Sequence, residues 1–523
     1  MAEPTSRRRF AVLAICCMSL LIVGLDGTIV NVALPALRRD LGASPAGLQW
    51  TIDSYTLVLA SLLMLGGSTG DRLGRRRIFQ TGLALFTAGS LLCSLAPGLG
   101  WLVAFRMVQA VGGSMLNPVA MSIITNTFTD PRERARAIGL WGAVIGISMA
   151  LGPVLGGILV ETVSWRAIFW INIPIGLAAL VLTHRFVPES RAPSPRRLDP
   201  VGQLLVIAVL STLTYSIIEA PAAGWTSTET LVLFAVAVAA AALLVGYESR
   251  RTEPLLDVRF FRSAPFSGAT AIAVCAFGAL AGFLFLNTIY LQDVRGYSAL
   301  HAGLLTLPMA LATLVIAPLS GRAVGRFGPR PSLLAAGVAL TAGSAAMTGL
   351  SPQTSVTTLM VAYVLFGTGF GLVNAPITNT AVSGMPLAQA GVAAAVASTS
   401  RQVGQSLGVA VIGSVAAATA TVGAVGAVGD GPGVGIDPTS TAAWWAVVAA
   451  CAAVLALGFA TTGTWARRTA DQTRSRLLTT PAPGQAATPQ EGTQQVATPP
   501  AATPQAGNQQ AAHPVTAEPE PSP

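Results

Sequence analysis

Three charged side chains interrupt long apolar stretches in the first part of the chain: Asp26, Asp53 and Arg106. A charged group near the centre of a bilayer costs roughly 3 kcal/mol on insertion scales, so it is kept only where a partner or a function needs it. Carboxylates and a guanidinium that meet in such surroundings titrate together, and they can hold or release a proton. The residue types therefore predict a proton-exchange site, in which Asp26 carries the proton, Arg106 controls when it leaves and Asp53 is a second acidic site.

Structural explanations for the same charges stay open at this point. The side chain of Arg106 is long enough to reach a lipid headgroup. Asp26 has Thr28 and Asn31 close by as local hydrogen-bond partners, and Asp53 lies near the start of its apolar stretch.

The apolar stretches that carry these residues recur along nearly the whole sequence. Apolar residues make up 52% of the 523 positions and charged residues only 10%, whereas ordinary soluble domains carry about 25% charged residues. Runs of about 20 apolar residues have the length that crosses a hydrocarbon core of about 30 Å. We therefore expect an all-α membrane protein with fourteen transmembrane helices, at residues 10–34, 48–68, 78–96, 101–122, 136–159, 167–186, 200–220, 230–248, 265–289, 302–322, 331–350, 356–378, 391–418 and 442–465.

The arginines predict which side of the membrane holds the two termini. The chain has no lysine, and 25 of its 31 arginines fall into segments that fourteen spans would place on the side of both termini. Basic residues are enriched in short cytoplasmic loops. This bias predicts a multi-pass protein of the cell inner (cytoplasmic) membrane with both termini in the cytoplasm, and it accounts for the net charge of +9 without a nucleic-acid partner. In this orientation Asp26 lies about 12 Å, and Asp53 and Arg106 about 8 Å, below the outer ends of their helices.

An internal repeat divides the expected helices into two groups. The pattern Gly67-x-x-x-Asp71-Arg72-x-Gly74-x-Arg76 follows the second span, and residues 321–330 repeat much of it 254 positions later. We expect a six-helix bundle at 1–186, a linker with two extra transmembrane helices at 187–263 and a second six-helix bundle at 264–465. A tail rich in proline, alanine, glutamine and threonine is expected to be disordered in the cytoplasm, at 466–523.

Several kinds of chemistry are excluded by the residues that the sequence lacks. Without lysine there is no P-loop lysine and no Schiff base. The three histidines lie far apart, and the five cysteines stand in apolar segments without a C-x-x-C pair, so we expect no metal site, no disulfide, no cofactor and no enzymatic activity. The first apolar run continues to about Leu34 without a cleavage site, so it is expected to be a retained helix.

Two glycine-rich motifs point to moving parts. The loop that contains Gly67, Asp71, Arg72, Gly74 and Arg75 serves as a topology signal, and the family resemblance given below implies that it is also a cytoplasmic gate. The fifth span contains Gly152-Pro153-x-x-Gly156-Gly157, which removes bulk from a helix face and deletes one backbone donor. Small residues let helices approach closely, so this face suits a tight seal, with ordinary small-residue packing as the alternative.

Taken together, these motifs resemble the fourteen-helix drug:proton antiporter branch of the major facilitator superfamily. The resemblance extends over most of residues 10–420. It rests on residues 25–35, on the loop at 67–76, on the fourth-span pattern Leu102-x-x-x-Arg106-x-x-Gln109, and on the fifth-span glycine-proline motif. Residues 165–174 and 401–404 add to it, whereas Ala110 stands where the family's fourth-helix motif has glycine.

The resemblance implies an exporter of lipophilic, typically cationic, drugs or antibiotics, driven by protons through alternating access. It implies that Asp71 latches the cytoplasmic side by contacting the other half. Its expected partners are a small lipophilic substrate, the coupling proton and the bilayer, and we expect it to act as a monomer. Polar residues of the expected substrate cavity are Asn31, Gln109, Asn117 and Arg401.

Three other functions remain open on the sequence alone. The chain could be a dedicated exporter of one metabolite or self-made antibiotic. It could be a proton-linked uptake symporter, which the glycine-proline motif of the fifth span disfavours on family grounds. It could also be a receptor or scaffold that transports nothing.

Overall fold

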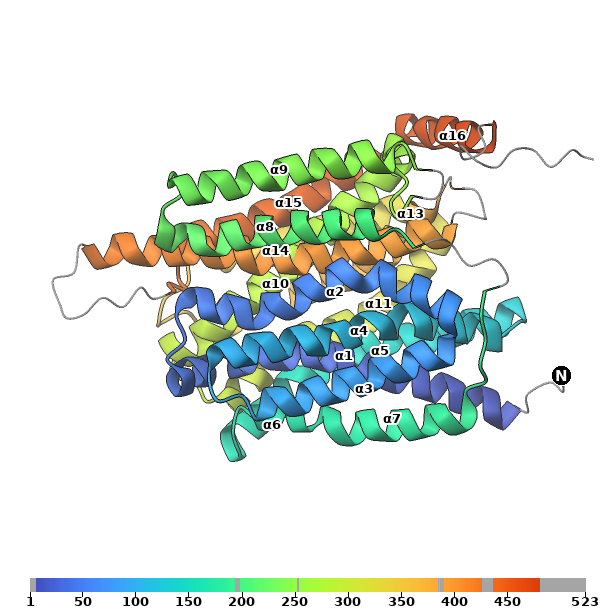
Figure 1. Cartoon of the computed structure of the whole chain (residues 1–523). Coiled ribbons are helices and arrows are strands. Elements are labelled where there is room, and N and C mark those ends of the chain that lie inside the picture. The colour runs from blue at the N-terminus through green and yellow to red at the C-terminus, as the bar shows by residue number, and fades with distance from the viewer. Residues whose placement is uncertain are drawn as a thin grey trace, which may run out of the picture.

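The protein is a bundle of long helices that run side by side. The computed structural model describes residues 6–192, 198–251, 254–383, 385, 390–425 and 436–479, and this part of the chain contains no β-strand. The N-terminus and α16 lie at the same end of the bundle (Figure 1), which we call the near end, and the opposite end is the far end.

The helices follow one another with short connections. Their bounds are α1 (Ser6–Leu41), α2 (Pro45–Leu73), α3 (Arg75–Ser94), α4 (Leu99–Thr127), α5 (Pro131–Thr162), α6 (Ala167–Trp170), α7 (Asn172–Phe186), α8 (Pro200–Ala223), α9 (Thr228–Glu248), η1 (Val258–Arg262), α10 (Ala264–Ile289), η2 (Tyr290–Val294), α11 (Ala299–Phe327), α12 (Pro329–Ala345), α13 (Val356–Val382), α14 (Ala390–Val425), α15 (Thr441–Thr461) and α16 (Thr464–Thr479). The segment η2 is one π-helical turn that continues α10.

The number of membrane-spanning helices differs from the fourteen expected from the sequence. Twelve helices in the described residues are long and apolar enough to cross a membrane. The expected spans at 78–96 and 331–350 do form helices, α3 and α12, but α12 has only 17 residues and α3 begins with three arginines. The all-helical membrane fold is confirmed, and a count of fourteen spans stays a prediction.

The internal repeat has a counterpart in the helix packing. In the first half α1 packs against α5, α2 and α3 pack against α4, and α3 packs against α7. In the second half the equivalent pairs are α10 with α14, α11 and α12 with α13, and α12 with α15. Two helix pairs form the seams between the halves: α5 with α11, and α14 with α2. The repeat relates α5 to α14 and α11 to α2, so each seam is the counterpart of the other. The halves are therefore related by an approximate two-fold arrangement.

The loops of the repeat need glycine for a stereochemical reason. Gly74 has φ +119° and Gly328, its equivalent 254 positions later, has φ +80°. Side chains other than glycine rarely adopt these angles. A Cβ on Gly74 would also meet Glu189 Oε1 at 2.6 Å. The Gly74 turn lets α3 begin directly after α2, and the Gly328 turn lets α12 begin directly after α11.

The extra helices α8 and α9 lie against the bundle through α8 (Figure 1), which contacts α2, α14 and α9. At its far end Trp50 Nε1 of α2 donates a hydrogen bond to Glu219 Oε1 of α8 at 2.9 Å. Ser414 Oγ of α14 donates to Ile217 O of α8 at 2.6 Å. Through α8 the pair touches both halves.

The segment expected to be a disordered tail starts with a helix. α16 extends to Thr479, and its buried residues Ala466, Ala470 and Leu477 pack inward, so the expectation of disorder is wrong for 466–479. Residues 480–523 lie outside the described part of the chain.

Candidate functional site

A buried ion pair joins α1 to α4 in the first half. Arg106 Nη1 lies 2.5 Å from Asp26 Oδ2, and the side chains are 1% and 0% exposed. Both residues stand within long apolar helices: Asp26 lies near the middle of α1, and Arg106 lies about two turns into α4. Two of the three charges that the sequence singled out are thus brought into direct contact.

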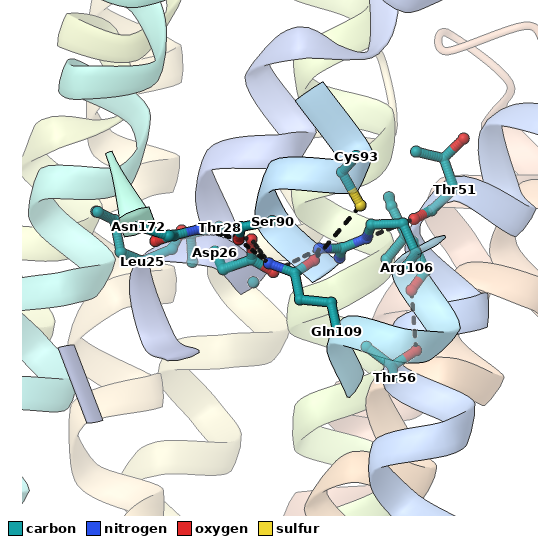
Figure 2. Close-up of polar contacts among 12 residues, drawn as sticks. Leu25, Asp26, Thr28, Thr51, Thr56, Ser90, Cys93, Arg106, Gln109 and Asn172 are labelled. Atoms are coloured by element: carbon teal, nitrogen blue, oxygen red, sulfur yellow. Dashed lines mark hydrogen bonds and ion pairs between the residues drawn. The ribbon is translucent and has the colours of Figure 1, made fainter. Parts of the chain in front are cut away.

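Amide and hydroxyl groups from neighbouring helices surround this pair (Figure 2). Gln109 Nε2 donates to Asp26 Oδ1 at 2.8 Å, and Asn172 Nδ2 donates to the same oxygen at 3.1 Å. Both amides also donate to Ser90 Oγ of α3, at 2.6 Å and 3.1 Å. Asp26 therefore receives hydrogen bonds from α4 and α7 in addition to its bond with Arg106.

The guanidinium of Arg106 has its own set of contacts. Nη1 also donates to Gln109 Oε1 at 2.8 Å, and Nε donates to the Thr51 carbonyl of α2 at 3.3 Å. Its carbon lies 4.2 Å from the centre of the Tyr55 ring, a cation–π distance. Five helices, α1, α2, α3, α4 and α7, therefore contribute to one network that we call the Asp26 network.

Three donors, one of them the charged guanidinium of Arg106, face the two oxygens of Asp26. A proton that binds there must displace part of the hydrogen bonding from Arg106. Losing one partner of a buried pair leaves an uncompensated charge, which costs about 3–5 kcal/mol. Protonation of Asp26 and repacking of Arg106 are therefore linked, which is the property that a proton-coupled conformational change requires.

Asp53 lies outside this network. It is fully buried on α2, where its Oδ1 accepts a hydrogen bond from Thr56 Oγ1 at 3.3 Å. Its Oδ2 has no hydrogen-bond partner, and the Ser406 side chain of α14 faces it from the other half. The structure thus places the second acid at the seam between α2 and α14, away from Arg106.

The loop expected to form a gate is held within the first half. Arg75 Nη2 at the start of α3 lies 2.7 Å from Asp71 Oδ1 at the end of α2, across the Gly74 turn. The Asp71 carbonyl accepts from Ala192 N at 3.0 Å. A Cβ on Gly67 would meet Pro118 of α4 at 3.2 Å. Arg72 is exposed near Gly74 at the near end. The described contacts of Asp71 lie in its own half, so the latch to the other half stays a prediction.

The glycine-proline motif of α5 faces two different helices. A Cβ on Gly152 would collide with the Thr28 side chain of α1, and one on Gly156 would meet Ile29 Cγ1 at 2.8 Å. A Cβ on Gly157 would meet Leu300 Cα of α11 at 2.5 Å. A Cβ on Gly303 of α11 would in turn collide with the Pro153 carbonyl of α5. The missing side chains therefore allow backbone contact within the first half and across the seam to the second.

A small cavity lies between the halves, next to this seam. It is lined by Thr28, Asn31, Val32, Met149, Pro153, Leu284, Thr288, Leu291, Gln292, Ala302, Thr306, Met309 and Ala310. The lining is mostly apolar, and its polar groups are hydroxyls and amides. With a volume of about 20 Å³ the cavity holds about one water-sized molecule, so a lipophilic substrate could bind here only after these walls move apart.

The residues expected in a substrate cavity are separated by the structure. Asn31 lines the cavity, whereas Gln109 belongs to the Asp26 network. Asn117 lies on α4, and its buried Oδ1 has no hydrogen-bond partner. Arg401 of α14 donates to Thr378 Oγ1 and lies 5.9 Å from the Phe277 ring centre, and neither contact supplies a counter-charge.

Three polar contacts join the halves at the far end. Arg38 Nη1 lies 3.5 Å from Asp293 Oδ2. Gln292 Nε2 donates to the Val32 carbonyl at 2.9 Å. Leu300 N donates to Glu161 Oε2 at 3.2 Å. Two of these three contacts involve residues of the π-helical turn η2.

Sequence reasoning missed Asn172, Ser90 and Tyr55 as members of the Asp26 network. Asn172 belongs to residues 165–174, which were noted only for their family resemblance. Trp165 Nε1 and Arg166 Nη1 of that segment both donate to Asp40 Oδ2 at 2.7 Å. These bonds fix the segment to the end of α1. Ser90 and Tyr55 gave no signal, because uncharged polar residues are frequent in membrane helices.

Comparisons with known proteins agree with this architecture. The sequence model of the Major Facilitator Superfamily matches residues 16–409. The chain is 39% identical over 401 residues to "Multidrug resistance protein Stp" of Mycobacterium tuberculosis, covering 77% of this chain and 74% of that protein. It is 39% identical over 398 residues to "Tetracenomycin C resistance and export protein" of Streptomyces glaucescens, with 76% and 74% covered.

A solved structure supports the fold alone. A bacterial homologue of the human lysosomal transporter Spinster, in an inward-facing and unoccupied conformation, matches with a TM-score of 0.60 at 18% identity. The match covers 91% of this chain and 99% of that one.

Proposed function

The chain belongs to the Major Facilitator Superfamily, and from this membership we propose that it exports lipophilic drugs or antibiotics across the cytoplasmic membrane by proton-driven alternating access. Its relatives carry names of drug resistance and export. The observation that carries the proton-driven part is the Asp26 network, because a carboxylate buried against one arginine must exchange that partner when it is protonated.

The proposal assigns a role to each group of residues. Asp26 takes up the proton, Arg106 repacks when it arrives, and Asp53 is a second acidic site at the α2–α14 seam. The cavity between the halves takes the substrate. The cavity lining holds no carboxylate, so the proton and the substrate act through different residues, and the two are coupled through α1, which carries both Asp26 and Asn31.

The direction and topology are part of the same proposal. The near end is the cytoplasmic side, in agreement with the arginine bias of its loops. In the conformation described here the far end is joined by Arg38, Gln292 and Glu161, which corresponds to closure toward the outside. We further propose that α3 and α12 cross the membrane together with the helices they pack against, which makes fourteen spans, and that one chain is the working unit.

The energy source follows from the sequence. The chain has no lysine to serve a P-loop. One elementary charge that crosses a membrane potential of 100 mV yields roughly 2.3 kcal/mol. A proton gradient is therefore the source that the Asp26 network is suited to use.

The test uses the full chain in liposomes with an imposed proton gradient and a fluorescent lipophilic dye. The wild type should move dye against its concentration gradient while protons move the opposite way. Asp26→Asn should insert normally but lose this accumulation, whereas Asp471→Asn, an exposed acid on α16, should keep it.

Other outcomes would overturn parts of the proposal. Dye that moves in the same direction as the protons would indicate a symporter. Transport of tetracenomycin C but of no unrelated dye would indicate a dedicated exporter. Loss of coupling in Asp53→Asn but not in Asp26→Asn would move the coupling site to the α2–α14 seam.

A further inference from the structure

The extra helix pair contains two buried acids that the proposed transport mechanism does not use. Asp199 precedes α8 and Glu248 ends α9, both at the near end, and they are 4% and 2% exposed. A carboxylate is rarely buried so fully unless its charge is balanced or removed.

Each of these acids has one oxygen with hydrogen bonds and one without. Asp199 Oδ1 accepts from Gly202 N at 2.9 Å and from the Tyr247 hydroxyl at 3.2 Å. Glu248 Oε2 accepts from Leu256 N at 3.4 Å. The remaining oxygens, Asp199 Oδ2 and Glu248 Oε1, are buried and have no hydrogen-bond partner.

The two unbonded oxygens face the same small space above Gly202. A Cβ on Gly202 would meet Glu248 Oε1 at 2.4 Å and Asp199 Oδ2 at 2.8 Å. Glycine at this position is therefore what allows the two carboxyl groups to converge.

Among the described residues, one ion pair brings positive charge to these acids. Arg251 Nε lies 3.6 Å from Asp199 Oδ2, and this side chain is 34% exposed. Tyr247 contributes a neutral hydroxyl from α9. From α2 the described contact is uncharged: Gln203 Nε2 of α8 donates to the Ser61 carbonyl at 2.6 Å. Within the described residues, one arginine pairs with Asp199 and none pairs with Glu248.

We propose that Asp199 and Glu248 form a proton-binding site, in which a single proton is held between Asp199 Oδ2 and Glu248 Oε1. The proton supplies the hydrogen bond that both oxygens lack, and it leaves the pair with one negative charge, which Arg251 balances. Two carboxyl groups that face the same small buried space cannot both ionise cheaply, and sharing a proton is the known solution for such pairs. The site is separate from Asp26, since it lies on α8 and α9 rather than on the first half.

Loss of this proton would weaken the junction between α8 and α9. Two buried negative charges would then face each other across Gly202. The positive charge beside them would be that of Arg251, which is partly exposed to solvent. Because Gln203 ties the same end of α8 to α2, the loosened junction lies next to a helix of the transport bundle. The site thereby makes the docking of the extra pair sensitive to the pH of the near end.

Infrared difference spectroscopy of the purified full chain tests the proposal without relying on transport. A protonated carboxyl group has a carbonyl stretch that disappears on ionisation. The wild type should show such a band and lose it as the pH rises. Glu248→Gln and Asp199→Asn should each remove one pH-dependent component of the band, and any remaining component belongs to other buried acids such as Asp53. Asn keeps the helix cap that Asp199 provides. Glu229→Gln, an exposed acid at the other end of α9, should keep it, as should Asp26→Asn.

Unfolding temperature provides a second readout on the same proteins. Between about pH 5 and about pH 9 the unfolded chain ionises both acids freely, whereas the folded chain must give up its shared proton. Wild-type stability should therefore fall by several degrees as the pH rises. Glu248→Gln, whose amide can donate where the proton was, should show little of this fall, and Glu229→Gln should behave as wild type.

Two results would overturn the proposal. If Glu248→Gln and Asp199→Asn retain the wild-type carboxyl band and pH slope, the pair holds no proton. If Mg²⁺ or Ca²⁺ added alone removes the band in the wild type and raises its unfolding temperature, but does neither in Glu248→Gln, the pair is a site for a divalent cation instead.

Discussion

Asn172 Nδ2 donates a hydrogen bond to Asp26 Oδ1 at 3.1 Å, across 146 positions of the sequence. The same amide donates to Ser90 Oγ, so Asn172 orients both an acid of α1 and a hydroxyl of α3. It begins α7 directly after the short helix α6, and this break in the sixth expected span places the amide at the depth of Asp26.

Asn172→Leu should impair proton coupling more than folding. A hydrogen bond to a charged group contributes about 1.5–3 kcal/mol, and its loss would leave Gln109 as the one amide donor to Asp26 Oδ1 in the described network. We expect dye accumulation to fall roughly tenfold or more. Asn126→Leu, at an exposed position of α4, serves as the control. Equal loss in both variants would contradict a positioning role for Asn172.

Arg106→Lys should rescue only a small part of the activity that Arg106→Ala loses. Arg106 donates from Nη1 to Asp26 and Gln109 and from Nε to the Thr51 carbonyl, and a lysine ammonium cannot reproduce this planar arrangement of donors. Initial rates in liposomes, measured at equal protein abundance, provide the comparison. Full activity of Arg106→Lys would show that a point charge is sufficient.

Gly157→Ala should disturb the seam between the halves. The new methyl group would meet Leu300 Cα at 2.5 Å, and overpacking of this kind costs about 1–3 kcal/mol or more when backbone must move. We expect the far end to close poorly, so that dye leaks down its gradient through the protein. Gly139→Ala is the matched control on α5, since nothing lies within 4 Å of its added methyl group. A tight, fully active Gly157→Ala protein would contradict the seam's role in sealing.

Asp71→Asn should reduce transport more than Arg77→Gln. Asp71 accepts two hydrogen bonds from Arg75, at 2.9 and 2.7 Å, within a tight turn. Arg77 is 71% exposed and lies 3.7 Å from Glu189, and exposed pairs of this kind contribute little. Transport rates of the two variants, normalised to membrane abundance, test this difference. Similar mild effects would leave the loop only its role in topology.

Truncation after Thr479 should leave transport intact, whereas truncation after Gly463 should not. Residues 480–523 contain no arginine and few apolar groups, so they add little packing. Removing α16 would expose its contacts with α10, including the bond from Ala264 N to Thr469 Oγ1 at 3.0 Å. Membrane abundance and dye transport of both truncated chains would be measured. Loss of transport in the longer chain would assign a role to the tail.

The charged residues inside apolar runs were the part of the site that the sequence could predict. Asp26 and Arg106 stand out because a membrane tolerates few charges, and their depths matched closely enough to predict contact. Depth alone does not say which way a side chain points around its helix. For this reason Asp53, at a similar depth, was grouped with Arg106 although it faces the second half.

Uncharged polar residues and helix ends limited the rest of the prediction. Asn172 and Ser90 look like ordinary membrane-helix residues until α3 and α7 are seen beside α1. Asp199 and Glu248 stand at the ends of their helices, where acids normally meet water, and only the packing of α8 on α9 shows that they are buried. Hydropathy was the basis for predicting the spans, and it is a weak guide for α3 and α12. α3 begins with three arginines, and α12 is only 17 residues long.

The π-helical turn η2 has a consequence for comparing this chain with its relatives. A π turn closes its hydrogen bond over one more residue than an α turn, so Tyr290–Val294 contains one residue more than a regular helix would need. Removing one residue here would rotate the following positions by about 100° and carry Gln292 and Asp293 away from α1. Homologues with a one-residue gap at this place in an alignment should therefore lack both far-end contacts, and a deletion scan through 289–295 would show the same discontinuity within this chain.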